Sequence, residues 1–158
     1  NLKNQEVENS VLPPPEPGDV LWCRFPEVEG IKPGPKSRPC IVLWVSDPPP
    51  PGEVAAYRIR VVYGTTKIKG KALPHEADID PVSNPSAFQA AGLSYPTRFS
   101  FKKVVVLNYD DMFFERAPQG EGIAPRPSPK MGILHPSMMK AFSAAYTFVQ
   151  QGGAKPKS

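Results

Sequence analysis

Proline is the feature that most limits what this chain can fold into. Of its 158 residues 22 are proline, and they occur along the whole length rather than in one tail. Proline has no backbone N–H to donate and clashes with the preceding turn of a helix. A bundle of long helices is therefore excluded. The composition predicts short strands joined by stiff loops.

Proline-rich segments also suggest where the packed part of the chain begins and ends. The first 17 residues are polar and finish in the run Pro13-Pro14-Pro15-Glu16-Pro17, which favours polyproline II, so 1–17 is expected to be a flexible tail. Residues 117–136 are expected to be an irregular proline-rich segment, and 152–158 a frayed end. We expect a single domain over residues 18–151.

Short apolar runs bounded by turn residues predict five or six strands in that domain. Residues 40–45 are apolar at every position, which indicates a central strand buried on both faces. Residues 55–63 alternate, which places Arg58 and Arg60 on the wetter face of a half-buried strand. The other strand signals are at 20–25, 97–101 and 104–109, the last two forming either two strands or one bent pair.

Two helices are predicted. Asn84 is a plausible N-cap, Pro85 suits the first helical position and Gly92 suits the stop, so a short helix lies between them. Apolar residues at helical spacing over 138–151 predict an amphipathic helix near the C-terminus. The predicted fold class is mainly β, a small barrel of short antiparallel strands with this helix packed on its outside and the short helix inserted.

Charge and cysteine content narrow the classes of partner and compartment. The net charge is +4, and residues 20–76 carry nine bases against five acids, which is compatible with nucleic acid as a partner. No apolar stretch is long enough to cross a bilayer and no signal peptide pattern is present.

Cys23 and Cys40 lie in apolar strand-like contexts, which favours two reduced, buried thiols and a cytoplasmic protein. The cysteines and the two histidines lack zinc-site spacing, so no metal or cofactor is expected.

Arg38 and the pair Thr65-Thr66 are the residues most suited to chemistry. Arg38 comes just before a buried strand, and the threonines end another. An arginine and a threonine hydroxyl at strand ends can converge on one phosphate, because the guanidinium gives charge-assisted bonds and the hydroxyl one more donor. The plainer alternative is that Arg38 is a surface arginine.

The order of these elements resembles the PemK/MazF toxins, the ribonuclease components of bacterial toxin–antitoxin systems. The resemblance covers about residues 17–110 and the last helix, and its elements are Gly18-Asp19-Val20-Leu21-Trp22, Phe25, Gly30, Arg38-Pro39, Gly64-Thr65-Thr66, Leu73-Pro74 and the helix from Met138. It implies an SH3-like barrel, a homodimer, a cognate antitoxin, and metal-independent cleavage of single-stranded RNA to a 2′,3′-cyclic phosphate and a 5′-hydroxyl.

The resemblance also implies which residues do the chemistry. The catalytic arginine of the family falls on Arg38 and its catalytic threonine on Thr65, with Thr66 the neighbouring candidate. Phosphate contacts are expected from Lys32, Lys36, Arg58, Arg60, Lys67, Lys69, Lys71 and His75. His75 is also conceivable as a general base, although a plain loop histidine is the simpler interpretation. Trp22, Trp44 or Tyr63 would stack bases if exposed, and the alternative for both tryptophans is the barrel core.

The chain also departs from the family pattern. Some members carry a glutamate in the first loop where this chain has Lys32, and Lys102-Lys103 stand where the family has a polar residue before its last barrel strand. Residues 117–136 have no counterpart. These departures support an alternative function, a non-catalytic SH3-like barrel that binds RNA or a protein partner.

Overall fold

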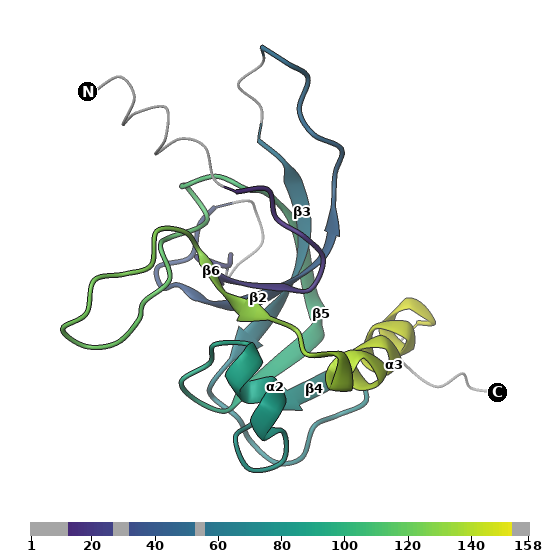
Figure 1. Ribbon diagram of the computed structural model, residues 1–158. Coiled ribbons are helices and arrows are strands. Elements are labelled where there is room, and N and C mark those ends of the chain that lie inside the picture. Colours follow the sequence, from purple (N-terminus) through teal and green to yellow (C-terminus); the bar gives the residue numbers. More distant parts are fainter. Residues whose placement is uncertain (1–12, 27–31, 53–55, 153–158) are drawn as a thin grey trace.

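The fold is described from a computed structural model, over residues 13–26, 32–52 and 56–152. Six strands form one antiparallel sheet in the order β4-β5-β3-β2-β1-β6 (Figure 1). They are β1 Asp19–Cys23, β2 Arg38–Val45, β3 Arg58–Thr65, β4 Glu76–Ile79, β5 Thr97–Asn108 and β6 Lys130–Ile133. The short helix α2 Pro85–Ala90 precedes β5, and a 3-10 turn, Pro136–Met138, leads into the last helix, α3 Met139–Gln150. The mainly β fold class predicted from the sequence is confirmed.

The sheet curls into a half-barrel because its strands are irregular at defined points. Val62 in β3 lies opposite Val104 in β5, but the next residue, Tyr63, lies opposite Ser100. Residues 101–103 are therefore extra on the β5 side, and a bulge of this kind bends a strand and increases its twist. The two strand signals at 97–101 and 104–109 thus belong to one long bent strand. Smaller register shifts, of one residue each, occur in the pairing of β1 with β6 and of β2 with β3.

The central strands are buried on both faces, as the apolar run at 40–45 predicts. In β1, neighbouring Val20 and Leu21 belong to two different apolar clusters, because successive side chains of a strand point to opposite faces. The first cluster lies between the sheet and the helices, where Phe142 of α3 packs at 5.5 Å from Phe99 and 5.6 Å from Phe101, measured between ring centroids. The second cluster lies on the opposite face.

The second cluster holds both cysteines. Cys23 and Cys40 are fully buried free thiols, as predicted, and burial raises the pKa of Cys40 well above its ordinary value. Phe113 and Phe114 close this cluster from the segment after β5. The same segment forms an isolated bridge between Phe114 and Cys23.

The residues at the two ends of α2 explain where this helix begins and ends. Asn84 is the N-cap of α2 and Pro85 its first residue, as predicted, but the Asn84 side chain accepts the backbone N–H of Asp80 instead of capping the helix. Gly92 has a φ of +71° and its N–H bonds to the Gln89 carbonyl, while the N–H of Leu93 bonds to the carbonyl of Phe88. This pair of bonds is a Schellman motif, which favours glycine at that position.

Two short strands were not predicted. β4 has four residues and pairs with β5, and β6 lies inside the segment 117–136 that we expected to be irregular throughout. A run of four residues is too short to show the periodicity of a strand. β6 forms because it pairs with the edge of β1. The tail prediction also needs correction at its end, since Pro15 is buried; residues 1–12, 153–158 and Gly30 lie outside the described residues.

α2 and β6 meet backbone to backbone. A Cβ on Gly92 would lie 2.1 Å from the carbonyl oxygen of Met131, and a Cβ on Gly132 would lie 2.2 Å from that of Ala90. Only glycine allows such an approach, because real Cβ atoms do not come this close to backbone atoms. No helix within the described ranges is long and apolar enough to cross a membrane.

Candidate functional site

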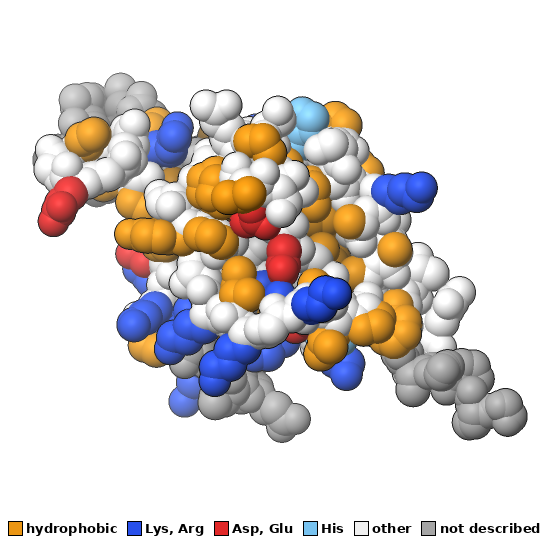
Figure 2. All heavy atoms as spheres, turned by 90° about the horizontal axis from the view of Figure 1, so that it is seen from below, with side chains coloured by type: hydrophobic (Ala, Val, Ile, Leu, Met, Phe, Trp, Pro, Cys, Tyr) orange, Lys and Arg blue, Asp and Glu red, His pale blue; other side chains and the backbone are white. Residues whose placement is uncertain are grey.

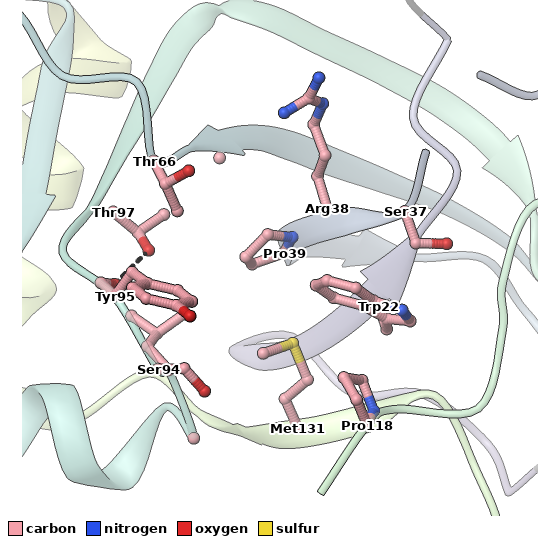
Figure 3. A pocket seen from close by; sticks show the side chains of 13 residues that line it. Trp22, Ser37, Arg38, Pro39, Thr66, Ser94, Tyr95, Thr97, Pro118 and Met131 are labelled. Atoms are coloured by element: carbon pink, nitrogen blue, oxygen red, sulfur yellow. Dashed lines mark hydrogen bonds between the residues drawn. The ribbon is translucent and has the colours of Figure 1, made fainter. Parts of the chain in front are cut away.

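A cavity of about 270 Å³ opens where β2 begins and β3 ends (Figure 3). Segments far apart in the sequence contribute to its lining, which consists of Trp22, Ser37, Arg38, Pro39, Gly64, Thr66, Gly92, Leu93, Ser94, Tyr95, Thr97, Pro118 and Met131. Arg38 and Thr66 are both chemical candidates from the sequence. The fold brings these two residues to one cavity.

The pairing of β2 and β3 explains why they meet. Cys40 of β2 lies opposite Tyr63 of β3 and the strands are antiparallel, so Arg38 at the start of β2 lies beside the end of β3. Gly64 makes this approach possible, because a Cβ there would lie 2.7 Å from both the Pro39 carbonyl oxygen and the Phe99 ring. The end of β3 is therefore held close to the strand that carries Arg38.

The two threonines are placed differently. The Thr65 hydroxyl accepts the backbone N–H of Lys67 at 3.1 Å, so it stabilises the turn that follows β3. Thr66 is exposed and lines the cavity, with its side chain on the same side as Arg38 (Figure 3). Of the two candidates from the sequence, Thr66 is the one that shares the cavity with Arg38.

A second cation, Lys103, contacts the same aromatic ring as Arg38. The Arg38 guanidinium carbon lies 5.7 Å from the centre of the Tyr63 ring, and the Lys103 ammonium lies 4.8 Å from the same centre. Both distances are typical of cation–π contacts. Lys103 reaches this position because it belongs to the bulged part of β5. No sequence pattern indicates this placement, since the bulge decides which way the side chain points.

A network of polar side chains holds Ser37, the residue that precedes β2, in place. The Ser37 hydroxyl donates to a carboxylate oxygen of Glu115, and the other oxygen lies 3.3 Å from the Arg24 guanidinium. Arg24 also donates to the Met112 carbonyl at 2.9 Å. This network ties the residue before Arg38 to the segment after β5. Its carboxylate, Glu115, was not a sequence candidate.

Arg98 holds the lysine-bearing loop after β3. Its side chain, 6% exposed, donates to both carboxylate oxygens of Asp78 at 2.7 and 2.9 Å. It also donates to the carbonyl of Lys69 at 2.8 Å and of Gly70 at 2.7 Å. The hydrogen bond to Asp78 is the main cause that raises the pKa of Arg98 above its ordinary value. The loop that follows Thr66 is therefore anchored to β4 and β5.

Aromatic and apolar side chains form much of the cavity wall. The rings of Trp22 and Tyr95 lie on different sides of the cavity, and Met131 and Pro118 lie along its lower edge in this view (Figure 3). Tyr95 is 67% exposed, which is high for a tyrosine. A second, more open cavity of about 470 Å³ adjoins the first and is lined by Thr66, Tyr95, Ile68 and Pro96. Thr66 and Tyr95 thus belong to both cavities.

The other predicted site residues fall into two groups. The first group lies in the two loops that precede Arg38 and follow Thr66 along the chain. Lys32 and Lys36 are exposed in the loop before Arg38, and the loop after Thr66 carries the exposed cations Lys67, Lys69 and Lys71. Lys and Arg side chains gather at one side of the molecular end that carries β4 and α2 (Figure 2).

The second group lies away from the cavity. Arg58 and Arg60 are at the opposite end of β3, roughly 20 Å away at the usual rise of a strand. Arg60 lies 5.4 Å from the centre of the Trp44 ring. Trp44 is 41% exposed and Trp22 is half-buried, so neither tryptophan belongs to the core. His75 is half-buried with its ring 3.7 Å from the Glu76 carboxylate, and does not line the cavity. Among the residues that the structure describes, no three His, Cys, Asp or Glu side chains are grouped so that they could hold a metal ion.

Comparison with known proteins identifies the fold. No protein-family model and no curated protein matches the sequence. The structure is similar to that of the Mycobacterium tuberculosis toxin MazF-mt6, with a TM-score of 0.51 and 16% sequence identity over 84% of this chain and 96% of that chain. A Mycobacterial endoribonuclease in complex with its cognate antitoxin aligns over 90% of this chain and 99% of its own, at 17% identity and a TM-score of 0.47. The similarity to MazF-mt6 confirms the MazF-like fold expected from the sequence resemblance.

Proposed function

We propose that this chain is the endoribonuclease toxin of a type II toxin–antitoxin system and cleaves single-stranded RNA without a metal ion. The observation that carries the proposal is that Arg38 and Thr66 line one cavity at the junction of β2 and β3. The fold that brings them together is the fold of the toxin MazF-mt6. The sequence resemblance to the PemK/MazF toxins supplies the reaction type.

The reaction uses the RNA's own 2′-hydroxyl as the nucleophile. Its oxygen attacks the adjacent phosphorus and its proton passes to a base, while the bond from phosphorus to the 5′-oxygen breaks and that oxygen takes up a proton. The products are a 2′,3′-cyclic phosphate and a 5′-hydroxyl. Charge on the phosphorus oxygens peaks in the transition state, so groups directed at those oxygens lower the barrier.

Arg38 has the role of stabilising that charge. A guanidinium stays protonated at all physiological pH values and offers paired donors to phosphate oxygens. The cation–π contact with Tyr63 favours one orientation of the Arg38 side chain, and Lys103 adds a second positive charge at the same ring. Thr66 donates a neutral hydrogen bond to the phosphate, and Thr65 acts through the turn it stabilises.

Cations on both sides of the site attract the RNA backbone. Lys32 and Lys36 precede Arg38 along the sequence, and Lys67, Lys69 and Lys71 follow Thr66. Such contacts are independent of base sequence and weaken as salt rises. Arg58, Arg60 and His75 do not line the cavity and would contact only nucleotides distant from the cleaved phosphate.

Homodimerisation and an antitoxin partner are part of the proposal. Within the described strands, β4 and β6 each pair on one side only. Exposed strand edges favour pairing with another chain, so a second copy is expected to cover one of them. The proposal includes a cytoplasmic location, where both RNA and an antitoxin are available.

The test is cleavage of end-labelled single-stranded RNA by the purified full chain, in the presence of EDTA. We expect cleavage with 2′,3′-cyclic phosphate ends, and a loss of about 100-fold or more for Arg38→Ala, the usual cost of removing one charged transition-state contact. Thr66→Ala should lose less, because its hydrogen bond is neutral. Arg58→Ala, at the far end of β3, is the matched control: at saturating RNA it should cleave at the wild-type rate, with at most weaker RNA binding. Wild-type rates for Arg38→Ala would refute the assignment.

A second candidate function is a non-catalytic barrel that binds RNA or a protein partner. The observation in its favour is Lys32, exposed at the position where some family members carry a loop glutamate. This function predicts that the folded wild-type chain leaves RNA intact. Binding to labelled RNA or to a co-purified protein, with no cleavage under any salt condition, would decide for it.

A further inference from the structure

We propose that the two adjoining cavities hold two consecutive bases of one RNA strand, and that the phosphate between those bases lies over Thr66 and Arg38. This inference rests on the proposed function and adds a binding mode to it. It assigns Trp22 and Tyr95 as stacking surfaces for the bases. Neither residue touches the phosphate chemistry, so their roles can be tested separately.

The first argument is the nature of the walls. Trp22 and Tyr95 bound the 270 Å³ cavity, and Tyr95 keeps two-thirds of its surface exposed although a large ring gains free energy by burial. Aromatic side chains beside a cationic groove are the usual platforms on which unpaired bases stack, since every base has a π-face. Met131 and Pro118 add apolar side chains to the lining of the same cavity.

The second argument is the polar groups around the rings. The Thr97 hydroxyl donates to the Tyr95 carbonyl at 2.8 Å, which fixes the backbone that carries the ring. Ser94 lies next to Tyr95, is exposed and lines the same cavity, so its hydroxyl is available for the polar edge of a base. A flat apolar slot with a hydrogen-bonding group at its edge matches the shape and chemistry of an unstacked nucleobase.

The third argument is continuity. Tyr95 and Thr66 line both cavities, so a strand that leaves the first cavity passes these two residues before it enters the second. Ile68 and Pro96 give the second cavity an apolar surface for the neighbouring base. The shared edge, with Thr66 and the nearby guanidinium of Arg38, is then the place of the intervening phosphate.

Charge favours RNA over an aromatic segment of a protein as the occupant. The loops that precede Arg38 and follow Thr66 include five exposed lysines, and none of the described residues that line either cavity is a carboxylate. A polyanion with planar bases complements this combination of rings and cations. A peptide side chain would fill the slot but would leave the phosphate position unused.

The experiment uses the chain's own fluorescence. Trp22 and Trp44 are its only tryptophans, so Trp44→Phe leaves Trp22 as the single reporter. The probes are eight-nucleotide 2′-fluoro RNAs of A, C, G or U, which cannot be cleaved because they lack the 2′-hydroxyl nucleophile. We expect at least one probe to quench Trp22 with saturation.

Variants of Tyr95 give the second measurement. Tyr95→Ala should weaken probe binding about tenfold, within the usual range for one stacked base, and Tyr95→Phe should retain it because the ring remains. Met112→Ala removes a side chain of similar exposure outside both cavities and should bind normally. These variants are also tested for cleavage of ordinary RNA.

The outcomes separate this inference from the proposed function. Suppose that the wild-type chain cleaves RNA and Arg38→Ala does not. If no probe then quenches Trp22, or if Tyr95→Ala binds the probes as tightly as the parent, the two-base assignment is wrong and the nuclease assignment stands. If quenching and the loss in Tyr95→Ala occur without cleavage, the base sites stand and the nuclease is wrong. If an antitoxin-type peptide quenches the Trp22 fluorescence and none of the RNA probes does, the inference is overturned.

Discussion

Replacing Arg98 with methionine should lower the free energy of unfolding by about 3 kcal/mol. The guanidinium is 6% exposed and donates to Asp78 twice, to Lys69 and to Gly70. Removing one partner of a buried ion pair typically costs about 3–5 kcal/mol, because the remaining charge loses its partner without regaining water. The Asp78 side chain is 28% exposed and can recover part of its hydration, so the lower end of that range applies.

The measurement is urea unfolding followed by circular dichroism. With a slope of about 2 kcal/mol per molar urea, a loss of about 3 kcal/mol moves the midpoint down by roughly 1.5 M. Arg58→Met is the control, since it removes an exposed arginine from the same sheet and should change stability by no more than about 0.5 kcal/mol.

A double-mutant cycle shows whether the pair itself is responsible. If the pair carries the effect, combining Arg98→Met with Asp78→Asn should cost clearly less than the sum of the two single changes, because both remove the same interaction. A loss below about 1 kcal/mol for Arg98→Met, or strict additivity with Asp78→Asn, would refute the argument, because a buried, hydrogen-bonded ion pair should produce neither result.

Three further changes have outcomes that follow from contacts already described. Gly64→Ala should destabilise by about 1–3 kcal/mol, the usual cost of overpacking, because its Cβ would lie 2.7 Å from the Pro39 carbonyl oxygen; thermal unfolding measures this, and an unchanged midpoint would contradict it. Burial raises the pKa of Tyr109 above its ordinary value near 10, so its contribution to stability is complete below about pH 10 and falls as pH rises further; urea midpoints from about pH 9 to 11 should decline less steeply in Tyr109→Phe than in wild type. Glu115→Ala should slow RNA cleavage about tenfold in single-turnover assays with little change in RNA affinity, since it frees Ser37 beside Arg38; equal losses in rate and affinity would argue against a positioning role.

Much of the fold could be predicted because its signals are local. The apolar run of β2, the alternation of β3 and the helical spacing of α3 each depend on residues close together in the chain. β4 and β6 could not be predicted, since each is four residues long and exists through its partner strand. Short elements of this kind are determined by the sheet rather than by their own composition.

The site was predictable only in part, for the same reason. Arg38 and the threonine pair stand at strand ends that the sequence marks clearly. The choice of Thr66 for the cavity depends on the turn after β3, and the position of Lys103 on a bulge in β5. Tyr95 carried no sequence signal at all, because its exposure results from how the α2–β5 connection crosses the cavity.

The glycine contact between α2 and β6 has a consequence for how this pocket can diversify. Gly92 lines the cavity, and its position depends on main-chain atoms of Met131, so this part of the pocket cannot be altered by exchanging one side chain for another. Ser94, Tyr95 and Pro118 are exposed side chains on connecting segments and can be exchanged without touching that contact. In a randomised library, variation at these three positions should yield folded proteins with altered ligand preference, whereas survivors should keep Gly92 and Gly132. A fixed backbone contact in one part of the cavity, combined with exchangeable side chains elsewhere in its lining, would let one fold acquire many ligand specificities.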